Sequence, residues 1–479
     1  MSLSQHPLLT LPPHAIRQVN SYLLLRDVVG VLLSASKGFN SRWQDRGSGL
    51  GRLNFHPTAE FPVVNWAKYT SGVSELYIGG KHGIPTSELA RLLSYCAFSL
   101  TCIHLSSTRP LERPLNMRDL YAQLIALRED NDTAATAAQH RRASLFPNLT
   151  TFVASNMFVN EMFYFFRACK LTTLRVLKVH RNNDLGASEL CSIDSNCVQH
   201  LVELSIDACP IHAESVVRML EILKQGGKNL LESKEASSSN GSNECNGEVT
   251  PPSKRLTLLP LRCLSLSVGG HGASGSHLHG STVLNWLSEN VECLQLRKLA
   301  LEQCDLDFET VGKYARNSGE ILTVLSIGGR HTNDDVVEAL CTNANHLPVL
   351  SSLSLKQSAT LTNQGLFALS SLGAQLRALD ISWCNLLTDV CIEQITTTLP
   401  LLQELMVGHC KKISDRGITK LLSTEKKKKK KGPGKNHLFL LDARHCPSIF
   451  VTDRKFVKMV DYARNTLGID LQLEGSGRM

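Results

Sequence analysis

The sequence predicts an α/β fold of stacked repeats, with a parallel sheet on the concave side, helices outside, and a small all-helical segment at the N-terminus. Three observations lead to this fold. A short phrase recurs along the C-terminal half at a spacing of 26 to 28 residues. Each copy first shows strand-like alternation and then a helix start. Residues 8–46 instead carry apolar residues at helical spacing.

The phrase is clearest in two neighbouring copies. Residues 376–384 read LRALDISWC and residues 402–410 read LQELMVGHC, so both spell L-x-x-L-x-[apolar]-x-x-C, 26 residues apart. A repeat of roughly 20–29 residues with this spelling is typical of a leucine-rich repeat. We therefore expect a leucine-rich-repeat solenoid, in which each unit buries its apolar face against its neighbours.

The repeat extends over most of the chain. Weaker copies begin at Val73, Leu100 and Leu149, and residues 469–473 are expected to form a last strand. These positions give about a dozen units. The clear copies begin at Leu174, Leu201, Leu261, Leu296, Leu322, Leu350, Leu376, Leu402 and Leu438.

The eighth residue after the leading leucine turns the chain away from the sheet. A small polar group is needed there to bond backbone that the strands do not reach. We expect this role for Asn182, Cys209, Cys304, Cys384, Cys410 and Cys446, with Ser358 as a substitute. Gly269 and Arg330 do not suit the position, which predicts local irregularity in their units.

The second half of each unit is expected to be helical. Thr388-Asp389 and Ser414-Asp415 are suitable N-terminal caps, and apolar residues follow them at helical spacing. Each fully buried leucine contributes about 1.5–3 kcal/mol, which provides ample core for this length.

The predicted boundaries follow from these patterns. We expect a helical segment at 8–46, a connection at 47–72, and the solenoid at 73–479. Inserts are expected at about 107–145, 224–257 and 424–437. The first carries Leu120, Leu124 and Leu127 at helical spacing and is expected to include a helix; the second is poor in apolar residues and is expected to be disordered.

The net charge of +8 is concentrated in one place, because six lysines lie at residues 426–431. Without them the net charge is +2. The run reads first as a solvated, disordered insert; a nuclear-import signal or a nucleic-acid tether is the alternative.

The fifteen cysteines do not predict disulfides, since at least five occupy the turn position. We expect buried, reduced thiols in a cytoplasmic or nuclear protein. Cys191, Cys197, Cys341 and Cys391 fall in the helical halves. There is no C-x-x-C pair, and the Gly- and His-rich stretch 269–279 reads as a loop rather than a metal site, so no metal or other cofactor is expected. No stretch is apolar enough for a membrane helix, and no signal peptide is recognised.

Residues 11–43 are expected to form three short helices, which in so short a segment cannot bury their own apolar faces well. The segment resembles an F-box through Leu11-Pro12, Ile16, Tyr22-Leu23, Asp27-Val28 and the ending from Ser36 to Trp43. His14-Ala15 and Asn20 depart from the family pattern. An F-box ahead of cysteine-containing repeats is the arrangement of F-box leucine-rich-repeat proteins.

This resemblance implies the substrate-recognition subunit of a cullin-RING (SCF-type) ubiquitin ligase, acting in ubiquitin-dependent protein catabolism. Its F-box would dock a Skp-type adaptor through Leu11, Pro12, Ile16, Val19 and Leu23. The alternatives are an N-terminal cap for the solenoid and, for the whole chain, a non-catalytic repeat scaffold without a ligase role.

The concave strand faces are expected to bind the target protein. The expected contact residues are Lys178, His180, Asp207, Glu302, Lys356, Asp380, Trp383, His409, Asp442 and Arg444. Their mixed charges suit a protein better than nucleic acid, which needs a basic stripe. Trp383 is either a rim contact or packing between units. No catalytic or phosphate-binding motif occurs, so no enzyme is predicted.

Overall fold

The computed structural model describes residues 52–55, 73–78, 86–106, 115–129, 144–156, 159–182, 185, 189–190, 192–238, 259–267, 278–318, 321–373, 375–430, 438–449 and 453–473. The chain divides into two units, one of residues 1–211 and 218–261, the other of residues 212–217 and 262–479. The helical segment expected at 8–46 lies outside the described residues, as does Gly269.

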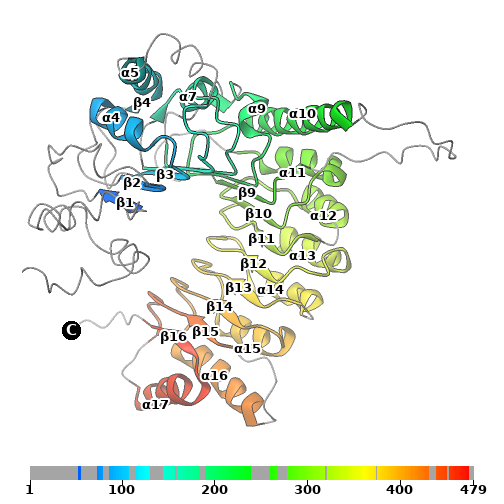
Figure 1. Ribbon diagram of the computed structural model, residues 1–479. Helices are drawn as coiled ribbons and strands as arrows, with labels where there is room; N and C mark the ends of the chain where they lie inside the picture. Colours follow the sequence, from blue (N-terminus) through cyan, green and yellow to red (C-terminus); the bar gives the residue numbers. More distant parts are fainter. Residues whose placement is uncertain are drawn as a thin grey trace, which may run out of the picture. The chain divides into compact units, whose positions relative to one another are not determined.

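The second unit is a leucine-rich-repeat fold in which strands and helices alternate (Figure 1). Its strands pair in parallel in the order of the sequence. They are β9 (Cys263–Ser267), β10 (Lys298–Glu302), β11 (Val324–Ser326), β12 (Ser352–Ser354), β13 (Ala378–Asp380), β14 (Glu404–Met406), β15 (Leu440–Asp442) and β16 (Asp470–Gln472).

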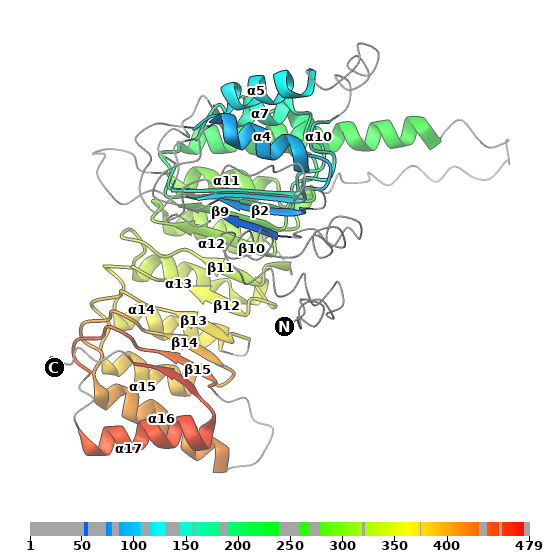
Figure 2. The ribbon, with the colours of Figure 1, turned by 60° about the vertical axis from the view of Figure 1, so that its left-hand side comes forward.

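The helices of this unit form a layer behind the strands, and each packs against the next (Figure 2). They are α11 (Gly280–Glu289), α12 (Phe308–Asn317), α13 (Asp334–Thr342), α14 (Asn363–Ala368), α15 (Asp389–Thr398), α16 (Asp415–Lys430) and α17 (Arg454–Tyr462). Short 3-10 turns η4 (Val291–Cys293), η6 (Ala344–His346) and η7 (Leu369–Leu372) and a π-helical turn η8 (Ala463–Leu467) complete the layer.

The core of the second unit is a row of leucines in exact strand register. Leu299, Leu325 and Leu353 are paired in succession, and each is at most 2% exposed. The row continues through Leu379, Leu405, Leu441 and Leu471. Since these are the fourth residues of the repeat phrase, the predicted fold class is confirmed.

The first unit repeats the same architecture with more aromatic packing. Its parallel strands are β1 (Arg52–Phe55), β2 (Glu75–Ile78), β3 (Cys102–Ser106), β5 (Thr151–Ser155), β7 (Val176–His180) and β8 (Glu203–Asp207). Its helices are α4 (Thr86–Cys96), α5 (Met117–Glu129), α7 (Met162–Ala168), α9 (Ser195–Val198) and α10 (Ala213–Ser238), of which α10 spans the division between the units. A small second sheet pairs β4 (Leu115–Asn116) with β6 (Val159–Asn160). Phe152 and Phe166 meet edge to face at 5.1 Å in the core.

The structure departs from the expected boundaries in three places. The sheet begins with β1, which pairs with β2, so the repeats start before residue 73. Helix α10 continues through Ser238, into a stretch expected to be disordered. Helix α16 continues to Lys430 and includes most of the lysine run. The helix expected in the first insert is confirmed as α5.

Among the residues that the structure describes, no helix is both long and apolar enough to cross a membrane.

Candidate partner-binding surface

In several units the turn that ends the strand begins with a buried polar residue, as the repeat phrase predicts. Asn182, Ser358, Cys384 and Cys410 are each 0% exposed. The Cys384 thiol donates to the Leu355 carbonyl at 3.2 Å, and the Cys410 thiol donates to the Ile381 carbonyl at 3.2 Å. Each thiol therefore ties its own unit to the backbone of the unit before it.

These thiols are held in the protonated state. Burial raises the pKa of Cys384 to about 12, against a hydrogen bond from the Ser358 backbone that lowers it. Burial likewise raises the pKa of Cys209 and of Cys391 to about 12. Cys384, Cys410 and Cys446 are free, buried thiols in the structure.

The unit that begins at Leu322 is irregular, as expected from Arg330. Arg330 is exposed, and Thr332 takes the buried place, donating its hydroxyl to the Ile327 carbonyl.

The seventh residue after the leading leucine has a left-handed backbone in several of the described units. The φ angle is 65° at Trp383, 61° at His409 and 58° at His445. The rings of Trp383 and His409 are stacked at 3.8 Å, and those of His409 and His445 at 4.4 Å. The same conformation occurs at Arg181, Ala208, Gln303 and Gln357.

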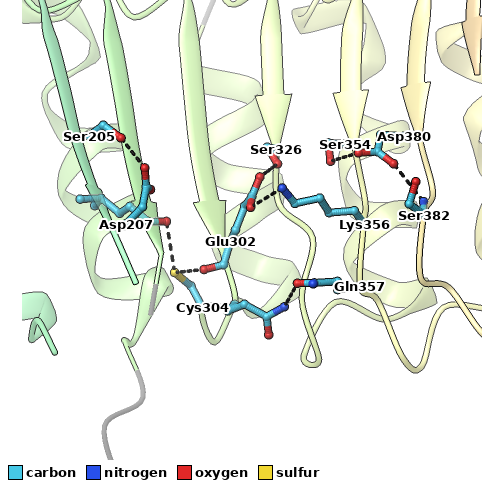
Figure 3. A network of polar contacts seen from close by, with 12 residues as sticks. Ser205, Asp207, Glu302, Cys304, Ser326, Ser354, Lys356, Gln357, Asp380 and Ser382 are labelled. Atoms are coloured by element: carbon cyan, nitrogen blue, oxygen red, sulfur yellow. Dashed lines mark hydrogen bonds and ion pairs between the residues drawn. The ribbon is translucent and has the colours of Figure 1, made fainter. Parts of the chain in front are cut away.

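The exposed face of the strands of the second unit carries a polar cluster that spans three units (Figure 3). Lys356 forms an ion pair with Glu302 at 2.8 Å, although a whole unit lies between them. Ser326, in that intervening unit, donates to the other carboxylate oxygen of Glu302 at 2.8 Å. Gly328 lies in the same intervening unit, where the backbones approach closely, since a Cβ atom there would lie 2.6 Å from the Lys356 backbone nitrogen.

Two further carboxylates stand on this face. Asp380 accepts hydrogen bonds from the Ser354 hydroxyl at 3.5 Å and the Ser382 amide at 2.9 Å. Asp442 binds the Arg444 guanidinium through two hydrogen bonds, at 3.0 and 2.8 Å. Burial disfavours the charged Asp442, but the hydrogen bonds and charge of Arg444 outweigh it and lower its pKa.

The predicted residues of the first unit lie on its own sheet face. Lys178 pairs with Glu203 of the next strand at 2.7 Å. Asp207 accepts a hydrogen bond from Ser205, and His180 lies beside Asp207 in the strand register.

The structure thus joins some predicted residues to each other and others to residues that were not predicted. It brings together Glu302 with Lys356, Trp383 with His409, and Asp442 with Arg444. Trp383 stacks on His409 of the next unit, so it packs between units, and it is still 46% exposed.

Sequence reasoning missed Glu203 and His445, and it placed Ser326 on the concave face without including it in the expected contact set. His445 could have been found because it holds the same repeat position as Trp383 and His409, the seventh residue after the leading leucine. Glu203 could have been found because it is the second residue after the leading Leu201, and strand alternation also places that residue on the exposed face. The adaptor-contact residues Leu11, Pro12, Ile16, Val19 and Leu23 lie outside the described residues.

Comparisons with known proteins leave the family unassigned. No family model matches the chain, and no curated protein matches it. A chain in the crystal structure of the Rad7 and Elc1 complex in yeast is similar at 15% identity, with a TM-score of 0.41, covering 84% of this chain and 89% of that one. A chain of the mouse RP105/MD-1 complex is similar at 13% identity, with a TM-score of 0.33, covering 86% of this chain and 53% of that one.

Proposed function

We propose that this chain is a non-catalytic protein receptor whose repeats bind a target protein through the exposed sheet faces. One observation carries the proposal. Side chains on the strands of the second unit are fixed by contacts between units, as in the Ser326–Glu302–Lys356 cluster. They therefore form an ordered surface of mixed charge. An ordered surface loses little side-chain entropy when a partner binds.

The finer proposal is that the receptor serves an SCF-type cullin-RING ubiquitin ligase. Its support is the F-box-like sequence at 8–46, with Leu11-Pro12 at its start and Ile16, Val19 and Leu23 at helical spacing. Burial of that apolar stripe against a Skp-type adaptor would complete a core that so short a segment lacks. The repeats would then present the target for ubiquitination.

The second candidate is a repeat scaffold without a ligase role. It is favoured by the departures from the F-box pattern at His14-Ala15 and Asn20. In that case the N-terminal helices would cap the end of the repeats.

Affinity purification of the tagged full chain, with mass spectrometry and a ubiquitin-transfer assay on the eluate, separates the two. The receptor proposal predicts that adaptor and cullin co-purify with a target that becomes ubiquitinated. The double variant Leu11→Ala, Pro12→Ala should lose adaptor, cullin and ubiquitin transfer but keep the target. Recovery of a target without adaptor, equally from both forms, would favour the scaffold.

A further inference from the structure

Exposed apolar side chains gather at one turn of the second unit. Trp383 is 46% exposed, Leu386 is 40% exposed and Val390 is 53% exposed, all within eight residues between β13 and the first turn of α15. Among the described residues of the second unit, the other large exposed apolar side chains are Phe308, Ile321, Val349 and Phe439. Contiguous exposed apolar groups with a polar rim are typical of interaction sites.

The fold does not require apolar residues at these three positions. They are the seventh, tenth and fourteenth residues after the leading Leu376. In the preceding unit the same positions hold Gln357, Thr360 and Gln364. The repeat therefore tolerates polar groups there, and the apolar character belongs to this one unit.

The following unit places basic groups at the same three positions. They are His409, Lys412 and Arg416, and Lys411 adds a further charge. A parallel bridge between Thr388 and Lys412 fixes the two turns side by side. The apolar row of one unit thus runs beside the basic row of the next.

The basic groups are available to a ligand. Lys411, Lys412 and Arg416 are exposed, and none of them forms an ion pair with another described residue. Two carboxylates share this edge but are engaged by backbone. Asp389 accepts from the Ser414 amide and hydroxyl, and Asp415 accepts from the Arg416 amide.

We propose that this edge, formed by Trp383, Leu386, Val390, Lys411, Lys412 and Arg416, binds an acidic segment of a protein partner that inserts an apolar side chain. The inference rests on the proposed receptor function and specifies its partner. The apolar side chain packs on Trp383 and Leu386. Carboxylates of the segment pair with Lys412 and Arg416, in charge-assisted hydrogen bonds.

A protein segment suits this edge better than nucleic acid. Bases bind by stacking on aromatic faces. Here one face of Trp383 is covered by His409, and the neighbouring contacts are the aliphatic Leu386 and Val390. Aliphatic side chains such as these pack well against an apolar side chain of a protein segment.

The test is selection of peptides from a random 12-residue phage library on the immobilised full chain, followed by anisotropy with the labelled peptides. The expected peptides combine Asp or Glu with a large apolar residue. Trp383→Gln should weaken their binding by about tenfold, the loss expected for a central interface tryptophan. Lys412→Glu with Arg416→Glu should weaken it by a similar factor.

The variants have matched controls. Gln303 and Gln357 occupy the Trp383 position of other units at φ 59° and 64°, so Trp383→Gln suits its backbone. Phe439→Gln removes an exposed aromatic side chain elsewhere and matches Gln403, its equivalent in the previous unit. Lys455→Glu with Lys458→Glu reverses two exposed charges on α17. Both controls should bind within about twofold of the unchanged chain, as expected for residues outside an interface.

The inference would be overturned if the selection yields no peptide, or if the selected peptides are neutral or basic. It would also be overturned if acidic peptides bind the Trp383 and Lys412/Arg416 variants as tightly as they bind the unchanged chain. Binding of oligo(dT) or poly(U) that depends on Trp383 would also overturn it, in favour of nucleic acid. The receptor function is judged separately, by whether the same preparations still capture adaptor and target. If the chain captures neither adaptor nor target but still binds the selected peptides, the edge binds peptides without a ligase role.

Discussion

At the scale of single residues, each repeat depends on a few positions that combine unusual backbone with small or buried side chains. The seventh residue is left-handed, and the eighth is a buried polar group bonded to backbone. The repeat phrase predicted the eighth position. It could not predict the stacking of Trp383 on His409, which depends on the backbone conformation that precedes the turn.

Gly328 should be intolerant of any side chain. A Cβ atom there would lie 2.6 Å from the Lys356 nitrogen and 2.9 Å from the Leu355 carbonyl carbon, so the strands would have to separate. We expect Gly328→Ala to destabilise the chain by about 1–3 kcal/mol, as overpacking does. Gly408 holds the same repeat position, but its nearest contact would be 3.3 Å, so Gly408→Ala should cost clearly less. Equal urea midpoints for the two variants would contradict this account.

The buried thiols predict a loss of stability in alkali. The pKa of Cys384 is about 12 in the fold against 9.0 for an unperturbed thiol. Between these values the unfolded chain ionises and the folded chain does not. The free energy of unfolding should therefore fall as pH rises from about 9 towards 12. Cys384→Ser has no ionising thiol at this position and should reduce the dependence, measured as urea midpoints at pH 8, 9 and 10. An unchanged slope would mean that the thiol ionises in the fold.

At the scale of elements, periodicity predicted strands and helices well and boundaries less well. The strands of the second unit follow from their leading leucines, and the caps at Thr388 and Ser414 are confirmed by bonds to the amides of Val390 and Arg416. Strand β1 was missed, although Leu50, Leu53 and Phe55 carry the repeat spacing.

The two helices that extend beyond their expected ends, α10 and α16, differ in the sequences of their extensions. The insert at about 224–257 was expected to be disordered because it contains few apolar residues, yet its first part, which includes Gly226 and Gly227, belongs to α10. In α16, lysine favours helix, and local contacts hold the first lysines. Lys428 pairs with the buried Glu425 at 2.6 Å, and Lys426 lies 4.4 Å from the centre of the Tyr462 ring. The contact of Lys426 with Tyr462 joins α16 to α17, and sequence composition could not show it.

Neighbouring helices are joined by a repeated carboxylate contact. The Asp389 carboxylate of α15 accepts from the Ser414 amide at 2.8 Å and its hydroxyl at 2.6 Å. Asp334 of α13 binds Thr362 in the same way. Asp389→Ala should therefore cost about 1–3 kcal/mol by leaving that amide without its acceptor. Asp461→Ala, at an exposed site on α17, should change the urea midpoint little. A neutral Asp389→Ala would show that water replaces the carboxylate.

At the scale of the whole molecule, stability arises between neighbouring repeats, and each repeat adds one strand to an exposed sheet face. The solenoid was predictable because its leading leucines recur in the sequence at a regular spacing. The cluster of Glu302 with Lys356 was not predictable, because it joins side chains of two units that are separated by a third. The sequence did not show the apolar edge at Trp383, because only the exposed fraction of each side chain distinguishes these apolar residues from the buried leucines of the core.

Isothermal titration calorimetry of the purified full chain against a purified Skp-type adaptor tests the central proposal most directly. The account predicts one-to-one binding in the micromolar range or tighter. Leu11→Ala with Pro12→Ala should abolish it while the urea midpoint of the repeats stays unchanged. Absence of binding at micromolar concentrations, with amides of residues 11–43 protected from hydrogen exchange, would contradict the ligase role and make this segment a cap of the repeats.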